Sequence, residues 1–310
     1  MEWFREHKEE HDYSLSKILS FSGISRQAHQ QALLRIREGE EKTGLYINLI
    51  YEIRLTHPGM GLRTIYEKWQ PAGIGRDTFI SLGLMAGYVI DPQPLGPKTT
   101  IAHPSANYPN LLKELKFTDV NQIWTSDITY FRIGEKWCYL TFIMDVYSRR
   151  IVGYSVSDNM KAYNNVAALQ MGLDLRGIDN YQGKLIHHSD RGSQYISNAY
   201  TDVLLDYEVK ISMCANVLEN AHIERVNGTI KNQYLKHWSI KNLHQLKKAT
   251  EKAIYAYNYE KPHSSIMKKS PVEFENFIQE IPLLERESIE IFTYHQNDDK
   301  CNPAQLSFEF

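Results

Sequence analysis

The stretch IWTSDITYFRIGEKWCYLTFIMDVYSRRIVGYSVS, residues 123–157, decides the fold class of this chain. It is rich in β-branched and aromatic residues, and it predicts three strands at 122–132, 137–147 and 151–157. The Gly-containing segment 133–136 separates the first two, as in a hairpin. We therefore expect three antiparallel strands in one sheet.

The following residues alternate between helix and strand. The pattern predicts helices at 164–175 and 198–207, short strands at 185–189 and 209–213, and a long helix at 219–237. Three antiparallel strands followed by alternating helices and strands make a mixed α/β sheet. This is the element order of the RNase H-like fold, and we place a catalytic core of that type at 119–280.

The N-terminal third predicts helices only, in two units at 1–38 and 39–90. In the first, the turn at 22–25 separates two short helices, and Ser25 can cap the second. In the second, three short helices end with one that starts near Arg76. Either unit can be a plain packing module or a helix-turn-helix unit that binds DNA. The downstream motifs favour the DNA-binding interpretation.

Proline and charge mark the remaining segments. Five prolines between 91 and 118 predict an extended linker. Residues 223–270 carry 10 basic and 3 acidic side chains, whereas 271–310 carry 2 basic and 9 acidic ones. The net charge of −2 thus conceals a basic segment that a phosphate backbone can approach. We assign 281–310 to an acidic C-terminal tail.

The composition excludes several classes of protein. The longest clean apolar stretch, 81–90, is half of the ~20 residues that a membrane helix needs. The charged N-terminus does not resemble a signal peptide. Three widely spaced cysteines make no zinc or redox pattern and fit a reducing compartment. We expect a cytoplasmic, nucleoid-associated protein without a membrane partner.

Three acidic residues occupy positions where a carboxylate is unusual or informative. Asp127 lies inside the first strand, where Asp is depleted. Asp190 follows the fourth strand, at the carboxyl edge of the sheet where α/β proteins place ligands. Glu224 lies on the long helix. Carboxylates in such an arrangement suit phosphoryl transfer with two Mg²⁺ ions. A single strand Asp is more often structural, so the prediction depends on all three.

Several neighbours could support this site. Asp145 is a competing carboxylate, but pairing with Arg149 or Arg150 is the simpler interpretation. His188 faces the same side of its strand as Asp190 and could orient it or contact DNA, although a packed, hydrogen-bonded histidine is the more common case.

Other side chains are candidates for contacts with DNA. Asn227 and Lys231 follow Glu224 by three and seven residues and share its helix face. We also assign DNA contacts to Lys236, Arg63 and Arg76. An aromatic and basic stretch, whose members are Tyr255, Tyr257, Tyr259, Pro262 and His263, either stacks on unpaired bases or packs against the core.

Five ordered motifs carry a family resemblance: WTSDITYF, YLTFIMDVYSRRIVGYSVS, HHSDRGSQYIS, ENAHIERVNGTIKNQYL and YNYEKPHSSIMKKSPVEFE. Together they resemble the integrase core of bacterial insertion-sequence transposases, in particular the OrfB type of the IS-three family, which is related to retroviral integrases. The resemblance covers about 119–276, and the N-terminal helical units resemble the same proteins.

The resemblance implies an activity and a site. It implies DNA strand cleavage and strand transfer during transposition, with Asp127, Asp190 and Glu224 as the catalytic, metal-binding carboxylates. It further implies two Mg²⁺ ions that Mn²⁺ can replace, double-stranded DNA at the element ends and the target, an OrfA-type partner or fusion, and a homo-oligomer on DNA. The 33 residues between Asp190 and Glu224 are fewer than the family usually has, which we attribute to the loop at 214–218.

Two rival functions use the same fold. One is a domesticated transposase that binds DNA without cutting it, which the intact acidic triad disfavours. The other is a structure-specific nuclease, which the helical N-terminal units and the PHSS motif at 262–265 disfavour.

Overall fold

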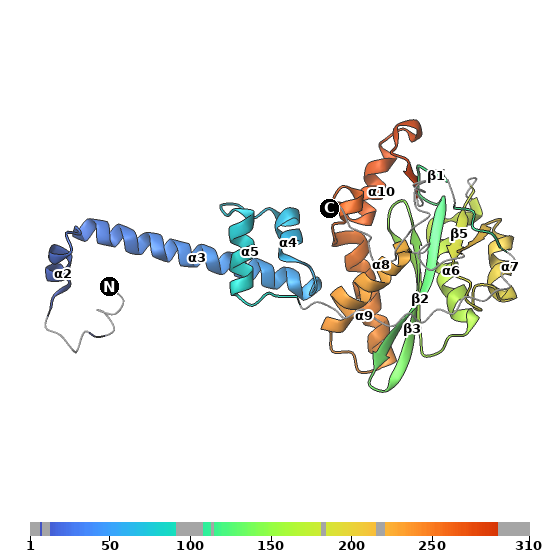
Figure 1. The fold of residues 1–310 in the computed structure, drawn as a ribbon, viewed down its shortest axis with the longest axis horizontal. Helices are drawn as coiled ribbons and strands as arrows, with labels where there is room; N and C mark the ends of the chain where they lie inside the picture. Colours follow the sequence, from blue (N-terminus) through green and yellow to red (C-terminus); the bar gives the residue numbers. More distant parts are fainter. Residues whose placement is uncertain are drawn as a thin grey trace, which may run out of the picture. The chain divides into compact units, whose positions relative to one another are not determined.

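The computed structural model describes residue 7 and residues 13–90, 108–112, 115–180, 184–214 and 221–290. The chain divides into two compact units, one formed by residues 1–56 and 60–90 and the other by 57–59 and 91–310 (Figure 1). No helix among the described residues has the length and apolar character needed to cross a bilayer.

The N-terminal unit contains four helices in its described part: α2 (Leu15–Phe21), α3 (Arg26–Thr56), α4 (Leu62–Trp69) and α5 (Arg76–Met85). As predicted, Ser25 accepts a hydrogen bond from the Ala28 N–H at 3.0 Å, at the start of α3. The end of α3 packs with α4 and α5 around Ile50, Ile65 and Phe79. Gly83 of α5 lies so close to Leu62 that a Cβ there would be 2.7 Å from a Leu62 methyl group.

One feature of this unit departs from the sequence-based interpretation. The boundary between 38 and 39 falls inside α3, which continues for 31 residues without a break. The helix contains Gly39 and Gly44, but the Glu, Lys and Arg residues between and around them are good helix formers and offset the cost of two glycines. The helix ends at Thr56, just before His57, Pro58 and Gly59.

The larger unit is built on a five-stranded sheet. Its strands are β2 (Ile123–Ile133), β3 (Lys136–Asp145), β4 (Ile151–Ser157), β5 (Ile186–Ser189) and β6 (Lys210–Met213), in the order β4-β3-β2-β5-β6. β2, β3 and β4 are antiparallel, as predicted, and β5 and β6 join in parallel beside β2. This mixed order confirms the RNase H-like fold class.

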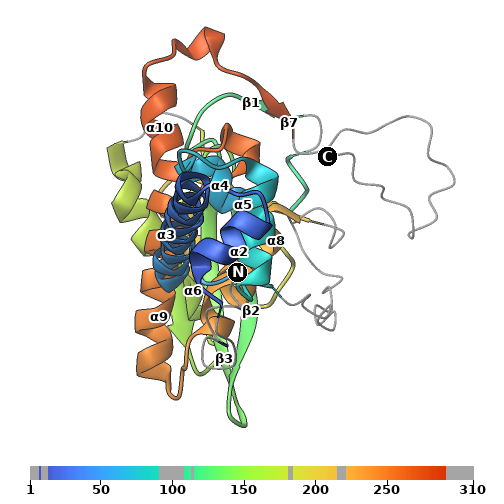
Figure 2. The ribbon, with the colours of Figure 1, turned by 90° about the vertical axis from the view of Figure 1, so that its left-hand side faces the viewer.

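Helices cover both faces of the sheet. Figure 1 shows α6 (Ala162–Arg176) and α7 (Asn198–Asp206) on one face, and α8 (Ala221–Thr229), α9 (Leu243–Tyr255) and α10 (Pro271–Gln279) on the other. In Figure 2, α9 and α10 follow one another along the same side of the unit. Alternation along β3 separates the two cores: Phe142 packs toward α8 and α9, and Ile143 packs toward α6.

The predicted long helix at 219–237 changes geometry along its length. After α8 the chain forms a π-helical turn, Ile230–Tyr234, and then a 3₁₀ turn, Leu235–His237. Residues 215–220, which include most of the shortened loop and the start of the predicted helix, lie outside the described residues.

The core extends beyond its predicted limits at both ends. β1 (Lys116–Phe117) pairs with β7 (Ile289–Glu290) in a separate two-stranded sheet. Arg286 forms an ion pair with Asp119, so residues 281–290 belong to the core and not to a free tail. The rest of the predicted tail, 291–310, and most of the predicted linker, 91–107 and 113–114, lie outside the described residues. Leu112 of the linker is buried against the core.

Gly153 on β4 provides a test of the contact between the sheet and α6. A Cβ at Gly153 would lie 2.0 Å from the backbone oxygen of Ala168, so Gly153→Ala requires α6 to move away. We expect a loss of roughly 1–3 kcal/mol or more in the free energy of unfolding, measured by urea denaturation. Gly228→Ala in α8 is the control, because the nearest atom to its Cβ would be 4.0 Å away. Equal stability of the two variants would contradict the close contact.

Candidate functional site

The pairing of β2 with β5 brings two of the predicted carboxylates together. The parallel register aligns Thr125 with His188 and Ser126 with Ser189. The next residue on each chain is an aspartate, Asp127 on β2 and Asp190 just after β5. Neighbouring strands lie about 4.8 Å apart. The two aspartates therefore lie side by side at the carboxyl end of β5, with Asp127 still within β2.

A hydrogen bond joins α8 to this pair. The Asn227 Nδ2 donates to Oδ2 of Asp127 at 2.7 Å. Glu224 lies one helical turn earlier on α8, so this bond fixes the helix that carries the third carboxylate against β2. Asn227 is only 5% exposed and bonds to Asp127, which fits a role in positioning that carboxylate; its contact with DNA stays a prediction.

The carboxylates act on one another electrostatically. Burial, the neighbouring Asp190 and, more weakly, Glu224 raise the pKa of Asp127 to about 8. Burial also raises the pKa of Asp190, and a hydrogen bond from the Gly192 N–H to its Oδ1 at 3.0 Å opposes that shift. Two neighbouring carboxylates repel each other when both are ionised. A cation bound between them would remove this repulsion, so the pair favours cation binding.

Lys231 lies close enough to Asp127 to affect its charge. Burial and the nearby Lys236 lower the pKa of the Lys231 ammonium group, and Asp127 opposes this change. The charge interaction brings a cation near Asp127, and the contact of Lys231 with DNA stays a prediction. Lys236, on the 3₁₀ turn, is exposed.

The metal-binding capacity rests on oxygen ligands. Asp127, Asp190 and Glu224 are hard carboxylate donors of the kind that Mg²⁺ prefers. Within the described residues, no three His, Cys, Asp or Glu side chains already form a group that could hold an ion. The donor chemistry fits Mg²⁺, and the third carboxylate has to approach the aspartate pair for all three to share in binding.

His188 has a packing role. It is fully buried, and its Nδ1 lies 2.9 Å from the Ser212 hydroxyl of β6. This agrees with the expectation of a packed, hydrogen-bonded histidine and joins β5 to β6 directly behind Asp190.

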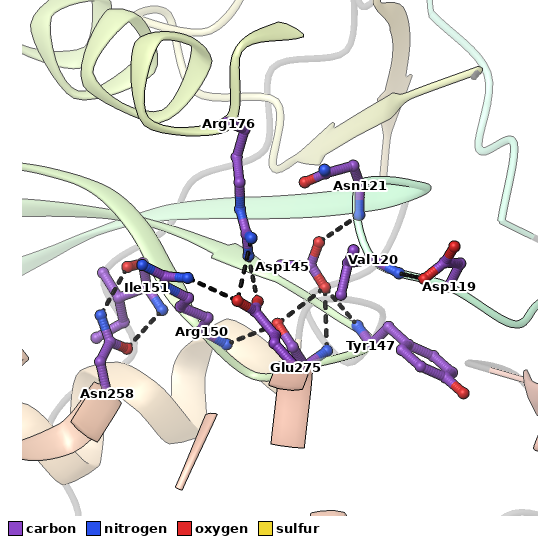
Figure 3. Close-up of polar contacts among 11 residues, drawn as sticks. Asp119, Val120, Asn121, Asp145, Tyr147, Arg150, Ile151, Arg176, Asn258 and Glu275 are labelled. Atoms are coloured by element: carbon purple, nitrogen blue, oxygen red, sulfur yellow. Dashed lines mark hydrogen bonds and ion pairs between the residues drawn. The ribbon is translucent and has the colours of Figure 1, made fainter. Parts of the chain in front are cut away.

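Asp145 is part of the structure of the β3–β4 turn (Figure 3). Its carboxylate accepts hydrogen bonds from the N–H groups of Asn121 at 2.6 Å and of Tyr147 and Ser148 at 3.0 Å. The predicted partner was wrong, because Arg150 instead pairs with Glu275 of α10 at 2.6 Å. Arg176 at the end of α6 pairs with the same Glu275. The Asp145 carboxylate thus stabilises a turn through backbone hydrogen bonds and is not among the candidate metal ligands.

Arg149 is a contact of α8 that sequence analysis missed. It has a left-handed backbone with φ of 65°, and its guanidinium lies 2.6 Å from Nδ1 of His222 in the first turn of α8. Burial and the charges of Arg149 and Arg225 lower the pKa of His222 to about 3, so the neutral ring accepts this bond. The paired arginines of the motif gave no sign that one would point toward α8.

Tyr195 is a second contact that sequence analysis missed. Its hydroxyl lies 2.8 Å from that of Ser126, the residue before Asp127. Both residues are buried. The bond supports β2 from beneath the aspartate pair, and the aromatic residue of the DRGSQY motif at 190–195 could have suggested such a role.

The two candidate arginines of the N-terminal unit lie on exposed helix surfaces. Arg63 of α4 pairs with Glu67 at 3.1 Å, and Arg76, the first residue of α5, pairs with Asp77 at 2.8 Å. Both helices exist as predicted. The DNA-binding roles of Arg63 and Arg76 remain predictions.

Comparisons with known proteins agree with this geometry. Two models described as "Integrase core domain" match residues 118–216 and 207–271. The transposase for insertion sequence element IS904 of Lactococcus lactis is 32% identical over 177 residues, which cover 56% of this chain and 69% of that protein. The chain belongs to the insertion-sequence transposases with an integrase core.

Other relatives of this transposase match over the same region. The insertion element IS600 uncharacterized 31 kDa protein of Shigella sonnei is 36% identical over 170 residues, which cover 54% of this chain and 61% of the relative. The match therefore spans about three fifths of that protein's length. Among solved structures, the HTLV-2 integrase catalytic core domain in complex with magnesium covers 51% of this chain and 97% of its own, with 23% identity and a TM-score of 0.42.

The carboxylate cluster of the transposase predicts an unusual effect of Asp127→Asn on stability. Because the folded pKa of about 8 exceeds the ordinary value of 3.8, ionised Asp127 destabilises the metal-free fold increasingly as pH rises between these values. The neutral variant should therefore melt higher than the parent at pH 8 in EDTA, by about 2–4 °C for each kcal/mol relieved.

Mg²⁺ should reverse the order of these melting temperatures. The ion should raise the melting temperature of the parent and have little effect on the variant, because the variant lacks the central carboxylate. Scanning fluorimetry at pH 6 and pH 8, with and without Mg²⁺, measures both effects. A variant that is less stable than the parent at pH 8 in EDTA would contradict the electrostatic account.

Proposed function

We propose that this chain catalyses DNA strand cleavage and strand transfer in the transposition of an insertion sequence, with Mg²⁺ as cofactor. The observation that carries the proposal is the β2–β5 register, which places Asp127 beside Asp190, together with the Asn227 hydrogen bond that holds α8 over them. The chain's membership of the transposase family supports the same reaction.

Each carboxylate has a distinct part in this proposal. Asp127, Asp190 and Glu224 would hold the ions, with Asp127 shared between Asp190 and Glu224. Two Mg²⁺ ions bound there would activate the attacking oxygen and stabilise the leaving oxygen of a phosphodiester. The attacking group is water during cleavage and a DNA 3′-hydroxyl during strand transfer, and no covalent bond to the protein forms.

The other side chains of the site position the reacting groups. Asn227 donates to Oδ2 of Asp127 and so limits the rotation of that carboxylate. Lys231, at the edge of the cluster, neutralises part of the phosphate charge that approaches it. His188 and Tyr195 keep the two strands rigid behind the aspartates.

We also propose the partners of the reaction. Double-stranded DNA is the substrate at the element ends and at the target. The helices α4 and α5 bind the element ends, with Arg63 and Arg76 on their exposed surfaces. The chain acts as a homo-oligomer on DNA, with an OrfA-type protein as partner or fusion.

The catalytic assignment is tested by three conservative variants. Asp127→Asn, Asp190→Asn and Glu224→Gln should each reduce strand cleavage and joining by at least about 10³-fold in Mg²⁺, because each removes a metal ligand while keeping side-chain volume. Gel assays on labelled element ends measure the products, and fluorescence anisotropy checks that DNA binding is retained.

Asp202→Asn is the matched control, since Asp202 is exposed on α7 and is not one of the predicted site residues. It undergoes the same chemical change and should keep full activity. A folded variant of the triad that cleaves as well as the control would refute the assignment. A parent protein that binds element ends but never cleaves them would instead indicate a domesticated DNA-binding protein.

Arg76 offers a separate test of the N-terminal unit. Arg76→Ala should weaken binding to the element ends more than binding to random duplex, because contacts to bases specify sequence and contacts to phosphates do not. The loss on the element ends should be about 1–3 kcal/mol if Arg76 makes a bidentate base contact. An equal loss on both DNAs would identify Arg76 as a phosphate contact and reject α5 as a recognition helix.

A further inference from the structure

A row of lysines lies on α9, away from the carboxylate site. Lys241 precedes the helix, and Lys247, Lys248 and Lys252 lie on its exposed face together with the single acidic residue Glu251. Four cations against one anion give this surface a net charge of +3, counted from 241 to 255. Among the described residues, no ion pair neutralises these four lysines.

The opposite face of α9 is buried and holds the helix, with its lysines, against the catalytic unit. Leu246, Thr250, Ala253 and Ile254 are buried, and the helix packs against β4 and the turns that follow α8. Asn242 caps its start by accepting a hydrogen bond from the Gln245 N–H at 2.9 Å. Lys247, Lys248 and Lys252 therefore project from a fixed helix, and the Lys241 N–H just before it donates to Oε1 of Gln245 at 2.8 Å. Both lower the entropy lost when the lysines bind a ligand.

Two exposed tyrosines continue the row, Tyr255 as the last residue of α9 and Tyr259 in the π-helical turn Ala256–Glu260 that follows. The rings of Tyr255 and Tyr259 stack with centroids 4.7 Å apart and an angle of 22° between their planes. They are 57% and 43% exposed, whereas Tyr257 between them is buried. The aromatic stretch thus divides its roles: Tyr257 packs in the core, and the other two rings present hydroxyl groups and flat faces to solvent.

This surface is separate from the candidate active site. The aspartates leave the sheet at β2 and β5, whereas α9 lies over β4. Two strand spacings, or about 10 Å, separate β4 from β2. DNA that lies along α9 can therefore continue toward the carboxylates or belong to a second duplex.

We propose that the exposed face of α9, from Lys241 to Tyr259, is a sequence-independent binding surface for the sugar–phosphate backbone of duplex DNA. The proposal rests on the function proposed above and adds a second place at which DNA is held. Lysine is a point charge that contacts phosphate without reading bases, and tyrosine hydroxyls also bond to phosphate oxygens. Such a surface suits DNA whose sequence is not fixed.

The charge of the surface is tested on the full chain by replacing three lysines together: Lys241→Gln, Lys247→Gln and Lys248→Gln. Binding to a random 30-base-pair duplex is measured by anisotropy in EDTA at about 50 and 200 mM salt. The variant should bind about tenfold or more weakly at the lower salt concentration. Its slope of log Kd against log salt should fall by about 0.9 for each phosphate that the variant no longer neutralises.

A matched control removes the same charge elsewhere. Lys136 and Lys210 are exposed at the starts of β3 and β6, and Lys184 is exposed just before β5. Their replacement by Gln should leave affinity within about threefold of the parent. Equal losses in the two folded triple variants would overturn the proposal, because the effect would then come from net charge and not from α9.

The tyrosine pair is tested with all lysines retained. Tyr255→Phe with Tyr259→Phe keeps the stacked rings and removes both hydroxyls, and it should weaken duplex binding severalfold. Unchanged affinity would show that the two tyrosine hydroxyls are not part of the DNA-binding surface.

The assay is independent of catalysis because EDTA is present. If the parent protein binds duplex with salt-dependent affinity but never cleaves DNA, the proposed activity is refuted. The affinities of the parent and the α9 lysine variant can still be compared in that case. A parent without salt-dependent binding would overturn the α9 proposal itself.

Discussion

The parallel pairing of β2 with β5 is the constraint on which the rest of the catalytic unit depends. A shift of one residue in this register would turn Asp127 and Asp190 to opposite faces of the sheet, since side chains alternate along a strand. Buried residues on both strands, such as Trp124 and Ile186, oppose such a shift. His188 and Tyr195 add polar contacts at the same level. The position of the carboxylates is therefore determined by packing and not by the carboxylates themselves.

The buried carboxylates of the catalytic unit have different surroundings. Asp145 and Glu275 are buried acids satisfied by backbone N–H groups and arginines, so they stabilise the turn and α10 without a metal. Burial raises the pKa of both Asp127 and Asp145, but their neighbours differ. Asp127 accepts hydrogen bonds from Asn227 and the Ile128 N–H and also has two acidic neighbours, Asp190 and Glu224, that oppose its ionisation. A cation placed among these like charges would relieve their repulsion.

Much of this organisation could be predicted from the sequence. The β-branched composition and turn at 133–136 identify the hairpin, and an acidic residue within a strand identifies Asp127. The direction of a side chain on a helix is harder to predict: spacing places Asn227 on the face of Glu224 but does not tell whether that face meets solvent or the sheet. Long-range pairs such as β1 with β7, two residues each, carry too little local pattern to detect. The continuity of α3 depends on how neighbours compensate for Gly39 and Gly44.

The pairing of β1 with β7 has a consequence for the architecture of the chain. It joins residues 116–117 to residues 289–290, two segments that lie far apart in the sequence. Phe117 is buried in the main core, and Ile289 packs against the same core. Removal of either strand would leave the other with unpaired backbone groups. The integrity of the catalytic unit therefore depends on residues at both of its ends.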